Sequence, residues 1–500
     1  MSNSYNDYNV YYGDLHNHCA VSYAHGPLSA ALENAKEQLD FVSITGHADW
    51  PDMPEPDERI QYIIDFHNQG FKKFRNSWEH YNKTVEKFHK DGEFVAFPGY
   101  EIHSCDDGDY TFVYKEAFQE LILGPINEVK EKLVGKDVIG FPHHIAYPVG
   151  SRGINWESFH DGLSPVIEIL SMHGMSIDCE SPRPFYHSMG PIDYHGTIAY
   201  GLTHGHKLGF LGCTDHHSAY PGSYGHGKTG VWAKDLTRES LWEAILARRT
   251  YAVTGDKVAL EFSINGVCMG DVIDSGAGEV EFNVNAHSAI DCIDLIKNNE
   301  LIERWSPRAK EDRDEEEFES HLYVELGWGE KHKAFEWNGE VCLKEGEILE
   351  VEPRFRGMEV VSPVEREKGL DIPFRNGEVK KVDHNIAEFK VVSRGNPTNV
   401  TPATQGFNLK SKLKNDGEVV LSVGEQKFSV DVKRLKSGSY SRNLGLIDSP
   451  AFRIHRLPHM SECLYSGAFK FHELKKGDFV YLKVRLKNNQ YAISSPVYVS

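Results

Sequence analysis

Short apolar runs separated by amphipathic segments are the feature that most constrains the fold of the first half of this chain. Six such runs, rich in β-branched and aromatic residues, lie at 10–15, 40–45, 93–100, 137–141, 165–170 and 208–213. Runs of this kind are typical of strands buried on both faces of a parallel sheet. The segments between them predict helices at 29–39, 57–90, 126–134, 193–207 and 237–248. Repeated strand–helix units predict an α/β fold whose parallel sheet is open or closed into a barrel.

From about residue 256 the sequence alternates apolar and polar residues, with Gly, Asn and Asp between the alternating segments. This alternation is typical of antiparallel strands that bury one face. It occurs at 258–266, 279–286, 291–299, 321–328, 418–423, 427–435 and 478–486. We therefore predict that the second half of the chain is mainly antiparallel β structure of a sandwich-like kind.

The change of pattern predicts two domains, over residues 1–255 and 256–500. Scattered turn residues around 395–460 suggest an insertion in the second domain. The charge-dense run at 305–320 predicts a solvated loop or an exposed helix.

The composition argues against several classes of protein. A net charge of −20 gives the 500-residue chain no global attraction for nucleic acid or anionic membranes, although bound divalent cations would attract an anion locally. Eight cysteines without a CxxC pair argue against a disulfide framework and a thiolate zinc site. We find no leader-like segment, and no apolar stretch approaches the ~18 residues of a membrane span. We expect a cytoplasmic protein, with no prediction of its oligomeric state.

Metal-ligating side chains follow all six apolar runs, and 19 of the 26 histidines lie before residue 230. In chain order they are His16 and His18, His47, Glu101, His143, His173, and Asp215 with His217. In closed βα barrels, groups at the carboxyl ends of the strands meet at one mouth. Nitrogen and carboxylate ligands without thiolate suit Zn, Mn or Fe.

The number and spacing of these residues indicate more than one ion. His16 and His18 stand two residues apart, so in an extended strand both imidazoles point the same way. Seven to nine ligands exceed the needs of one ion and fit two or three, with Glu101 able to bridge through its two oxygens. Each residue alone has a plain structural alternative, such as a surface histidine or a solvated acid, and only the joint pattern favours a metal centre.

The residues next to these ligands are candidates for other roles. Adjacent side chains in an extended segment point oppositely, so His144 and His216 are expected to face away from the ions and to line a substrate pocket. Arg152, in the loop after the fourth run, is either a phosphate clamp or a solvated loop arginine.

The motifs GDLHNH, ITGHAD, PGYE, FPHH, IEI with a following His, and TDHH resemble, in that order, the motifs of the PHP (polymerase and histidinol phosphatase) family. The resemblance spans about residues 11–255. It implies a distorted barrel, usually of seven strands, and a trinuclear Zn, Mn or Fe centre. By position it implies the ligands His16, His18, His47, Glu101, His143, His173, Asp215 and His217. His25 is implied as a further ligand only with a one-residue shift.

A second resemblance extends into the other half of the chain. The segment TDHHSAYPGSYG, the stretch from LTRES to SINGVCMGD and the strand ending in SSPVYVS look like a bacterial subgroup of PHP proteins of unknown function. Members of that subgroup carry a β-rich second domain, which agrees with the pattern after residue 256. The resemblance names no substrate.

Three functions are compatible with this reading. The first is metal-dependent hydrolysis of a phosphoester, with Glu101, His217, His144, His216 and Arg152 as candidate catalytic residues. The second is hydrolysis or elimination at a glycan, amide or lactone bond with the same metals. The third is a non-enzymatic module that keeps its metals for structure. We expect a small-molecule or glycan-linked anionic substrate.

Overall fold

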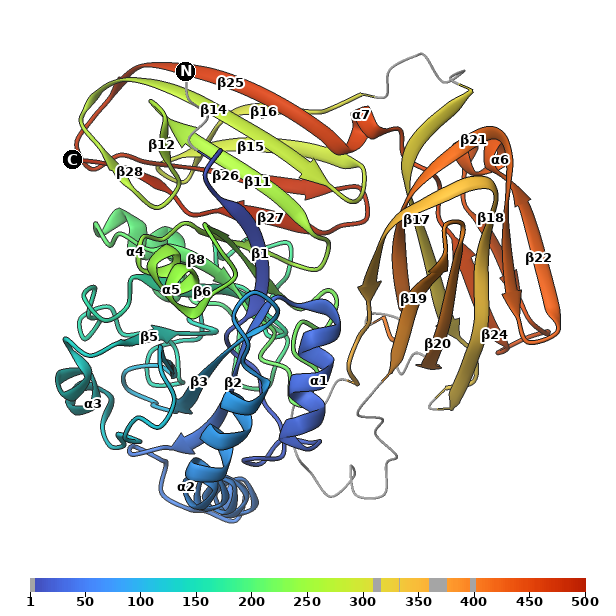
Figure 1. Cartoon of the computed structure of the whole chain (residues 1–500). Coiled ribbons are helices and arrows are strands. Elements are labelled where there is room, and N and C mark those ends of the chain that lie inside the picture. The colour runs from blue at the N-terminus through green and yellow to red at the C-terminus, as the bar shows by residue number, and fades with distance from the viewer. Residues whose placement is uncertain (1–4, 309–315, 332, 359–375, 396–401) are drawn as a thin grey trace.

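The computed structural model describes residues 5–308, 316–331, 333–358, 376–395 and 402–500 of the chain. Figure 1 shows three parts. A part with helices and short strands lies at the lower left, a layer of long strands lies above it, and a separate sheet lies at the right. The fold is mixed α/β and rich in strands, as the sequence predicts at this coarse level.

The six predicted runs of the first half all form strands. They are β1 (Asn9–Asp14), β2 (Phe41–Asp49), β3 (Val95–Ile102), β5 (Val138–Pro142), β6 (Val166–Ser171) and β8 (Gly209–Gly212). Strands β1, β2 and β3 form a parallel ladder, and β6 is parallel to β8. All except β1 are buried along nearly their whole length, as expected of strands covered on both faces.

Four further strands were not predicted, and they make the sheet mixed rather than parallel throughout. They are β4 (Tyr110–Tyr114), β7 (Gly174–Met175), β9 (Lys228–Ala233) and β10 (Thr250–Val253). Strand β4 lies antiparallel between β3 and β5, and β9 lies antiparallel between β1 and β10. The connection from β3 to β4 is too short for the helical crossover that a parallel pair requires, so this pair is antiparallel.

The segments that follow β1 and β8 run side by side. The Asp215 N–H donates to the His16 carbonyl at 2.8 Å, and the His18 N–H donates to the His216 carbonyl at 2.8 Å. On the other side, the Thr45 N–H of β2 donates to the Asn17 carbonyl at 2.9 Å. The ends of β1, β2 and β8 therefore meet. The seven-stranded barrel stays a prediction, because the ladders of the described residues place β6 and β8, with β7, in a sheet separate from that of β1, β2 and β3.

Four of the five predicted helices form within a few residues of their expected bounds: α1 (Leu28–Gln38), α2 (Gln61–Phe88), α3 (Ile126–Leu133) and α5 (Arg238–Leu246). The fifth prediction, over 193–207, is largely wrong. That segment holds only the 3-10 turn η1 (Tyr194–Gly196) and the short α4 (Ile198–Thr203), because Gly205 adopts a φ of +89° and ends the helix. Within the described residues, no helix is both long and apolar enough to cross a membrane.

The second half of the chain builds two further sheets and extends the first. The extension consists of β13 (Val272–Ile273), β15 (Ile290–Lys297), β16 (Glu300–Trp305), β26 (Phe479–Leu486), β27 (Tyr491–Ser494) and β28 (Val497–Val499). A four-stranded sheet holds β11 (Val258–Ile264), β12 (Val267–Cys268), β14 (Gly276–Ala286) and β25 (Leu464–Leu474). The short helix α7 (Met460–Cys463) precedes β25.

In the part of the chain that the structure describes, the separate sheet at the right of Figure 1 has eight antiparallel strands. They are β17 (Glu317–Trp328), β18 (Ala334–Arg354), β19 (Gly377–Asp383), β20 (Ile386–Arg394), β21 (Gln405–Val423), β22 (Gln426–Asp431), β23 (Tyr440–Asn443) and β24 (Pro450–Ile454). Helix α6 (Val432–Ser437) packs against β21. Most core residues of this sheet, such as Trp337, Leu409 and Phe452, belong to one cluster of their own.

One sheet crosses the boundary expected at residue 255. Strand β10 pairs with β9 on one side and with β27 on the other, where Ala252 lies opposite Ile493. The two halves also share a core cluster in which Phe210 and Ile493 are both fully buried. The domain bounds and the insertion at 395–460 stay predictions. Residues 309–315, within the charge-dense run, and 396–401 lie outside the described residues.

Candidate metal centre

The side chains predicted at the strand ends come together. Among the described residues, five groups of three donors have their ligand atoms within 4.8 Å of one another, and all their members are buried. Eight of the nine predicted metal ligands belong to these groups: His16, His18, His47, Glu101, His143, His173, Asp215 and His217. They come from β2, β3 and the segments that follow β1, β5, β6 and β8.

Glu101 of β3 lies among several imidazoles. Its Oε2 is 3.0 Å from His16 Nε2 and 3.2 Å from His18 Nε2. Its Oε1 is 3.3 Å from His143 Nε2. The two oxygens thus face different histidines, as a carboxylate that bridges two ions requires.

Asp215 takes a similar position on the opposite segment. Its Oδ1 is 3.0 Å from His18 Nε2, and its Oδ2 is 3.1 Å from His173 Nε2. Nε2 of His18 therefore faces both carboxylates, Glu101 and Asp215.

Three observations test whether these residues fit metal ions. The Nε2 atoms of His16 and His18 face each other at 3.1 Å. Nε2 of His143 is buried without a hydrogen-bond partner among the described residues, although it points at Glu101. The donor set is imidazole and carboxylate only. Lone pairs that converge in this way fit shared divalent cations, and this set suits Zn, Mn or Fe.

The Nδ1 atoms of four predicted ligands, His47, His143, His173 and His217, are engaged by the protein, which leaves their Nε2 atoms to face the centre. Nδ1–H of His217 donates to the Asp215 carbonyl at 2.8 Å. Hydroxyl groups contact Nδ1 of the others: Ser22 for His47 at 3.2 Å, Thr111 for His143 at 3.1 Å and Tyr147 for His173 at 2.7 Å. Such contacts fix the tautomer and orientation of a ligating imidazole.

His16 is oriented by Glu168, a residue to which the sequence analysis gave no role. Its Nδ1–H donates to Glu168 Oε2 at 2.7 Å, and both side chains are fully buried. A carboxylate that accepts a hydrogen bond from a ligating histidine makes the other ring nitrogen a stronger electron-pair donor to a metal ion. The sequence feature that could have revealed Glu168 is its position as a charged residue inside the otherwise apolar run of β6.

Asp14, the last residue of β1, forms hydrogen bonds with the loop that carries Asp215. Its carboxylate accepts from the backbone N–H groups of His16 at 3.2 Å, Thr214 at 3.1 Å and Gly222 at 2.9 Å. Burial raises its pKa to about 6. These bonds hold the ends of β1 and β8 in register.

The two central carboxylates are ionised at neutral pH. Burial would raise the pKa of Glu101, but nearby imidazoles, His143 and His47 foremost, outweigh burial and hold this pKa well below its usual range. The pKa of Asp215 is also held low, because His16 and His173 outweigh the effect of burial. Ionised carboxylates are the form that binds metal.

The imidazoles differ in their protonation. Burial lowers the pKa of His143 and of His144 to about 4, so both are neutral near pH 7 and offer lone pairs. The pKa of His16 is raised, because Asp215 and Glu168 outweigh burial. A cation that binds at His16 has to displace this proton, so metal binding is expected to release protons.

Three further donors belong to the same groups: His103, Asp109 and His144. His103 Nδ1 is 3.1 Å from Glu101 Oε1 and 2.8 Å from Asp109 Oδ2. His144 Nε2 is 3.3 Å from Asp109 Oδ2, so His144 lies among the donors and not away from them as predicted. His144 adopts a φ of +32°, so the chain is not extended there and the expected alternation of neighbouring side chains does not apply.

Arg152 is neither solvated nor free for a ligand. Its guanidinium forms an ion pair with the buried Asp109 and contacts His103. It also lies over the Trp50 ring, with 5.1 Å between the guanidinium carbon and the ring centroid. As a phosphate clamp it would have to exchange part of its pairing with Asp109.

The remaining predicted residues lie at the edge of the centre. His216 is buried outside the five donor groups, with its ring 5.3 Å from that of His226. His25 is also outside these groups, although its backbone N–H donates to the His217 carbonyl at 2.9 Å. Its role as a ligand stays a prediction.

Comparison with known proteins gives partial matches. The family described as "Protein of unknown function (DUF3604)" matches residues 222–267, a segment that holds β9, α5, β10 and β11. An uncharacterized protein of Chlamydia pneumoniae is 25% identical over 262 residues, which is 46% of this chain and 41% of that protein. An uncharacterized protein of Chlamydia trachomatis is 26% identical over 253 residues, or 45% of this chain and 40% of that protein.

Among solved structures, the chain is similar to a two-domain protein from Bacteroides vulgatus, described as containing a "predicted PHP-like metal-dependent phosphoesterase". The TM-score is 0.34 at 13% sequence identity, over 85% of this chain and 96% of that one. The aligned regions thus span about two fifths of the chlamydial relatives, and the chain is similar to a family of unknown function over the segment that follows the TDHH motif.

Proposed function

We propose that the chain is a metal-dependent hydrolase that cleaves phosphoesters with two or three divalent ions. The observation that carries this proposal is that the donor groups share members. Glu101, His18, His47 and His144 each belong to two groups. Ligands shared between neighbouring groups are what closely spaced ions need, and centres with ions ~3.5–4 Å apart are typical of phosphoester hydrolysis.

The eight predicted ligands within the donor groups would hold the ions. When bound, such ions acidify water and neutralise the charge that develops on phosphate oxygens. This local positive charge would let a chain with a net charge of −20 hold an anionic substrate. We propose a small-molecule or glycan-linked phosphoester as that substrate.

His144 and Asp109 are the pair we assign to the leaving group. His144 Nε2 lies 3.3 Å from Asp109 Oδ2, and Arg152 and His103 hold the Asp109 carboxylate from other directions. A carboxylate fixed in this way favours the Nε2–H tautomer of the neutral imidazole, which could donate a hydrogen bond to a departing alkoxide. Asp109 is thereby a positioning residue and His144 a catalytic one.

The direct test is turnover of p-nitrophenyl phosphate and a wider phosphoester panel. We expect EDTA to abolish activity and Mn²⁺ or Zn²⁺ to restore it. Glu101→Gln should lower activity by more than the roughly 10–100-fold that loss of an outer-sphere partner costs. Glu131→Gln, an exposed position on α3, is the matched control and should keep full activity.

Two outcomes would contradict the proposal. If metal-replete protein turns over amide, lactone or glycoside substrates but none of the phosphoesters, the bond that is cleaved is a different one. If Glu101→Gln binds less metal and unfolds more readily while no substrate of either class is turned over by the unaltered protein, the ions serve the structure.

A further inference from the structure

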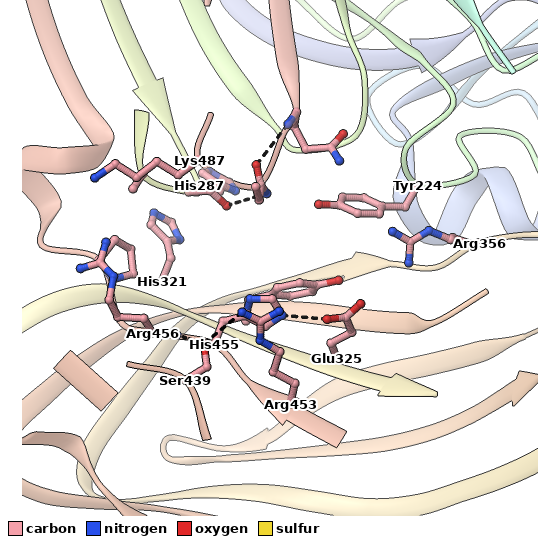
Figure 2. Close-up of a pocket in the computed structure, with 16 residues that line it drawn as sticks. Tyr224, His287, His321, Glu325, Arg356, Ser439, Arg453, His455, Arg456 and Lys487 are labelled. Carbon is pink, nitrogen blue, oxygen red and sulfur yellow. Dashed lines mark hydrogen bonds and ion pairs between the residues drawn. The ribbon is translucent and has the colours of Figure 1, made fainter. Parts of the chain in front are cut away.

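A polar cavity lies between the second-half sheets and the loop after β8, apart from the metal centre. Its volume is about 440 Å³, within the range of sites for small molecules. Tyr224 of the loop, His287 after β14, and Lys487 after β26 line it on one side. Residues of β17 and the region around β24 line it on the other (Figure 2). None of the lining residues belongs to the five donor groups.

The walls of this cavity are cationic in an acidic chain. Four of the lining side chains are permanently charged cations: Arg356, Arg453, Arg456 and Lys487. Glu325 is the one acidic side chain among the lining residues that the structure describes. Glu325 is itself engaged, because it accepts a hydrogen bond from the Thr404 hydroxyl at 2.7 Å and lies 2.9 Å from His455 Nε2. The lining thus carries a surplus of positive charge, whereas the chain as a whole carries −20.

Two of the four cations have no carboxylate at ion-pair distance within the described part of the chain. Arg356 is buried, donates to the Thr404 carbonyl and hydroxyl, and lies over the Tyr224 ring at 4.8 Å. Arg453 is exposed, and its guanidinium donates to Ser439 Oγ at 3.3 Å. Their charge is therefore available to an anion. Arg456 and Lys487 both pair with Glu462, so two cations share one carboxylate.

The two acids behind the cavity, Asp256 and Glu352, are engaged by groups other than the four wall cations. Arg354 is fully buried and lies 3.1 Å from Asp256 and 3.2 Å from Glu352. Glu352 also lies 2.8 Å from His287 Nδ1. Asp256 accepts hydrogen bonds from the Tyr224 hydroxyl and from the Asn488 amide. These bonds hold Tyr224, His287 and Asn488 in place around the cavity. They leave Arg356 and Arg453 as the wall arginines without a carboxylate partner in the described part of the chain.

The cations are spread over the cavity and are not gathered at one point. Figure 2 shows Arg356 beside Tyr224 at one end and Arg456 and Lys487 at the other, with Arg453 between them. A single small ion could touch only part of this set. We propose that the cavity binds a small organic molecule that carries at least two acidic groups, carboxylate or phosphate. The guanidinium groups would bind these acidic groups by charge-assisted hydrogen bonds.

Isothermal titration of the full-length, metal-loaded protein at low ionic strength tests this proposal. The probes are glutarate, pentanoate and inorganic phosphate. Glutarate and pentanoate have the same chain length and differ in one carboxylate, so we expect glutarate to bind at least tenfold more tightly. Comparison with phosphate shows which kind of acidic group the ligand carries. Tighter binding of phosphate than of glutarate would point to a phosphorylated ligand. Tighter binding of glutarate than of phosphate would point to a dicarboxylate.

Variants locate the binding. Arg453→Gln and Lys487→Gln should each weaken binding of the tighter probe roughly tenfold, the effect of losing one hydrogen bond to a charged group. Arg442→Gln, an exposed arginine of β23 outside the cavity, is the matched control. Equal near-ultraviolet circular dichroism of the variants shows that each is folded. An anion bound only at the metal centre would be insensitive to Arg453→Gln and Lys487→Gln, and that result overturns the proposal. Failure of all three probes to bind the unaltered protein overturns it as well.

Discussion

His16 depends for its orientation on a carboxylate carried by another strand. Glu168→Gln keeps the size of the side chain but removes the charge that holds the His16 Nδ1–H at 2.7 Å. We expect metal affinity to fall roughly 10–100-fold, as for other outer-sphere partners of ligating histidines. Competition with a chromophoric chelator measures the affinity. Glu131→Gln on α3 is the control, and equal affinities of the two variants would show that Glu168 has no part in binding metal.

Lys228 carries a buried charge that nearby carboxylates compensate only in part. It lies at the start of β9, and its Nζ has no hydrogen-bond partner among the described residues. Burial lowers its pKa from 10.5 to about 8. Between these two pH values the folded protein binds fewer protons than the unfolded chain, so the free energy of unfolding rises with pH across this window. Below about pH 8 the whole cost of burying the charge is present.

Lys228→Met should therefore stabilise the protein. We expect a gain of about 3 kcal/mol below pH 8, which shrinks toward zero as the pH approaches 10.5. Urea unfolding at several pH values measures the difference between the variant and the unaltered protein. Lys470→Met, at an exposed position of β25, should have little effect at any pH. A gain that does not change with pH would contradict this explanation.

The predicted ligands could be found from the sequence, because each of them follows an apolar run. His103 was within reach of the same reasoning, because it stands two residues after Glu101 and so points to the same side of an extended segment. Asp109 was not. It precedes β4, and it meets His143 and His144 only through the pairing of β4 with β3 and β5, which no local pattern reveals.

At the scale of the elements, a glycine allows β9 to pack closely between β1 and β10. Gly230 lies opposite Tyr12 of β1 and Tyr251 of β10, and a Cβ there would come within 2.2 Å of the buried Tyr251 ring. Gly230→Ala should destabilise this sheet by about 1–3 kcal/mol through overpacking. The midpoint of thermal unfolding measures the effect. Gly438→Ala, where a Cβ meets only the end of the Arg434 side chain, should be close to neutral.

The elements that were predicted are those with a strong local signal. Long periodic segments such as α2 and continuous apolar runs such as β3 form as expected. Strands β9 and β10 were missed because one is interrupted by Gly230 and the other has only four residues. Both owe their conformation to pairing with strands far away in the sequence, and single-sequence patterns do not report such partners.

At the scale of the molecule, Tyr498 of β28 forms hydrogen bonds with the half of the chain that carries the metal centre. The Tyr498 hydroxyl accepts from the Leu208 N–H at 2.6 Å and donates to the Leu208 carbonyl at 2.7 Å, directly before β8. Tyr498→Phe leaves both groups buried without this partner and should cost about 1–3 kcal/mol. Hydrogen exchange of the amides around β8 should become faster. Tyr186→Phe, at a tyrosine that is 81% exposed, is the control and should leave exchange unchanged.

The continuous sheet from β5 to β13 also explains why the relation between the two halves was not evident from the sequence. The alternating pattern after residue 256 correctly indicates antiparallel strands. It does not show that β27 pairs with β10, or that Phe210 and Ile493 share a core. Pairing across more than 200 residues depends on tertiary packing, which local periodicity does not encode.

The pairing of β10 with β27 has a consequence for the biosynthesis of the chain. Roughly 240 residues separate the two strands, so a ribosome adding ~5–20 residues per second needs roughly 10–50 s between them. During this interval β10 leaves an open strand edge, and exposed edges are where nascent chains pair with the wrong neighbour. Slower translation of the second half should therefore lower the soluble yield, and a holdase chaperone that covers the edge should restore it.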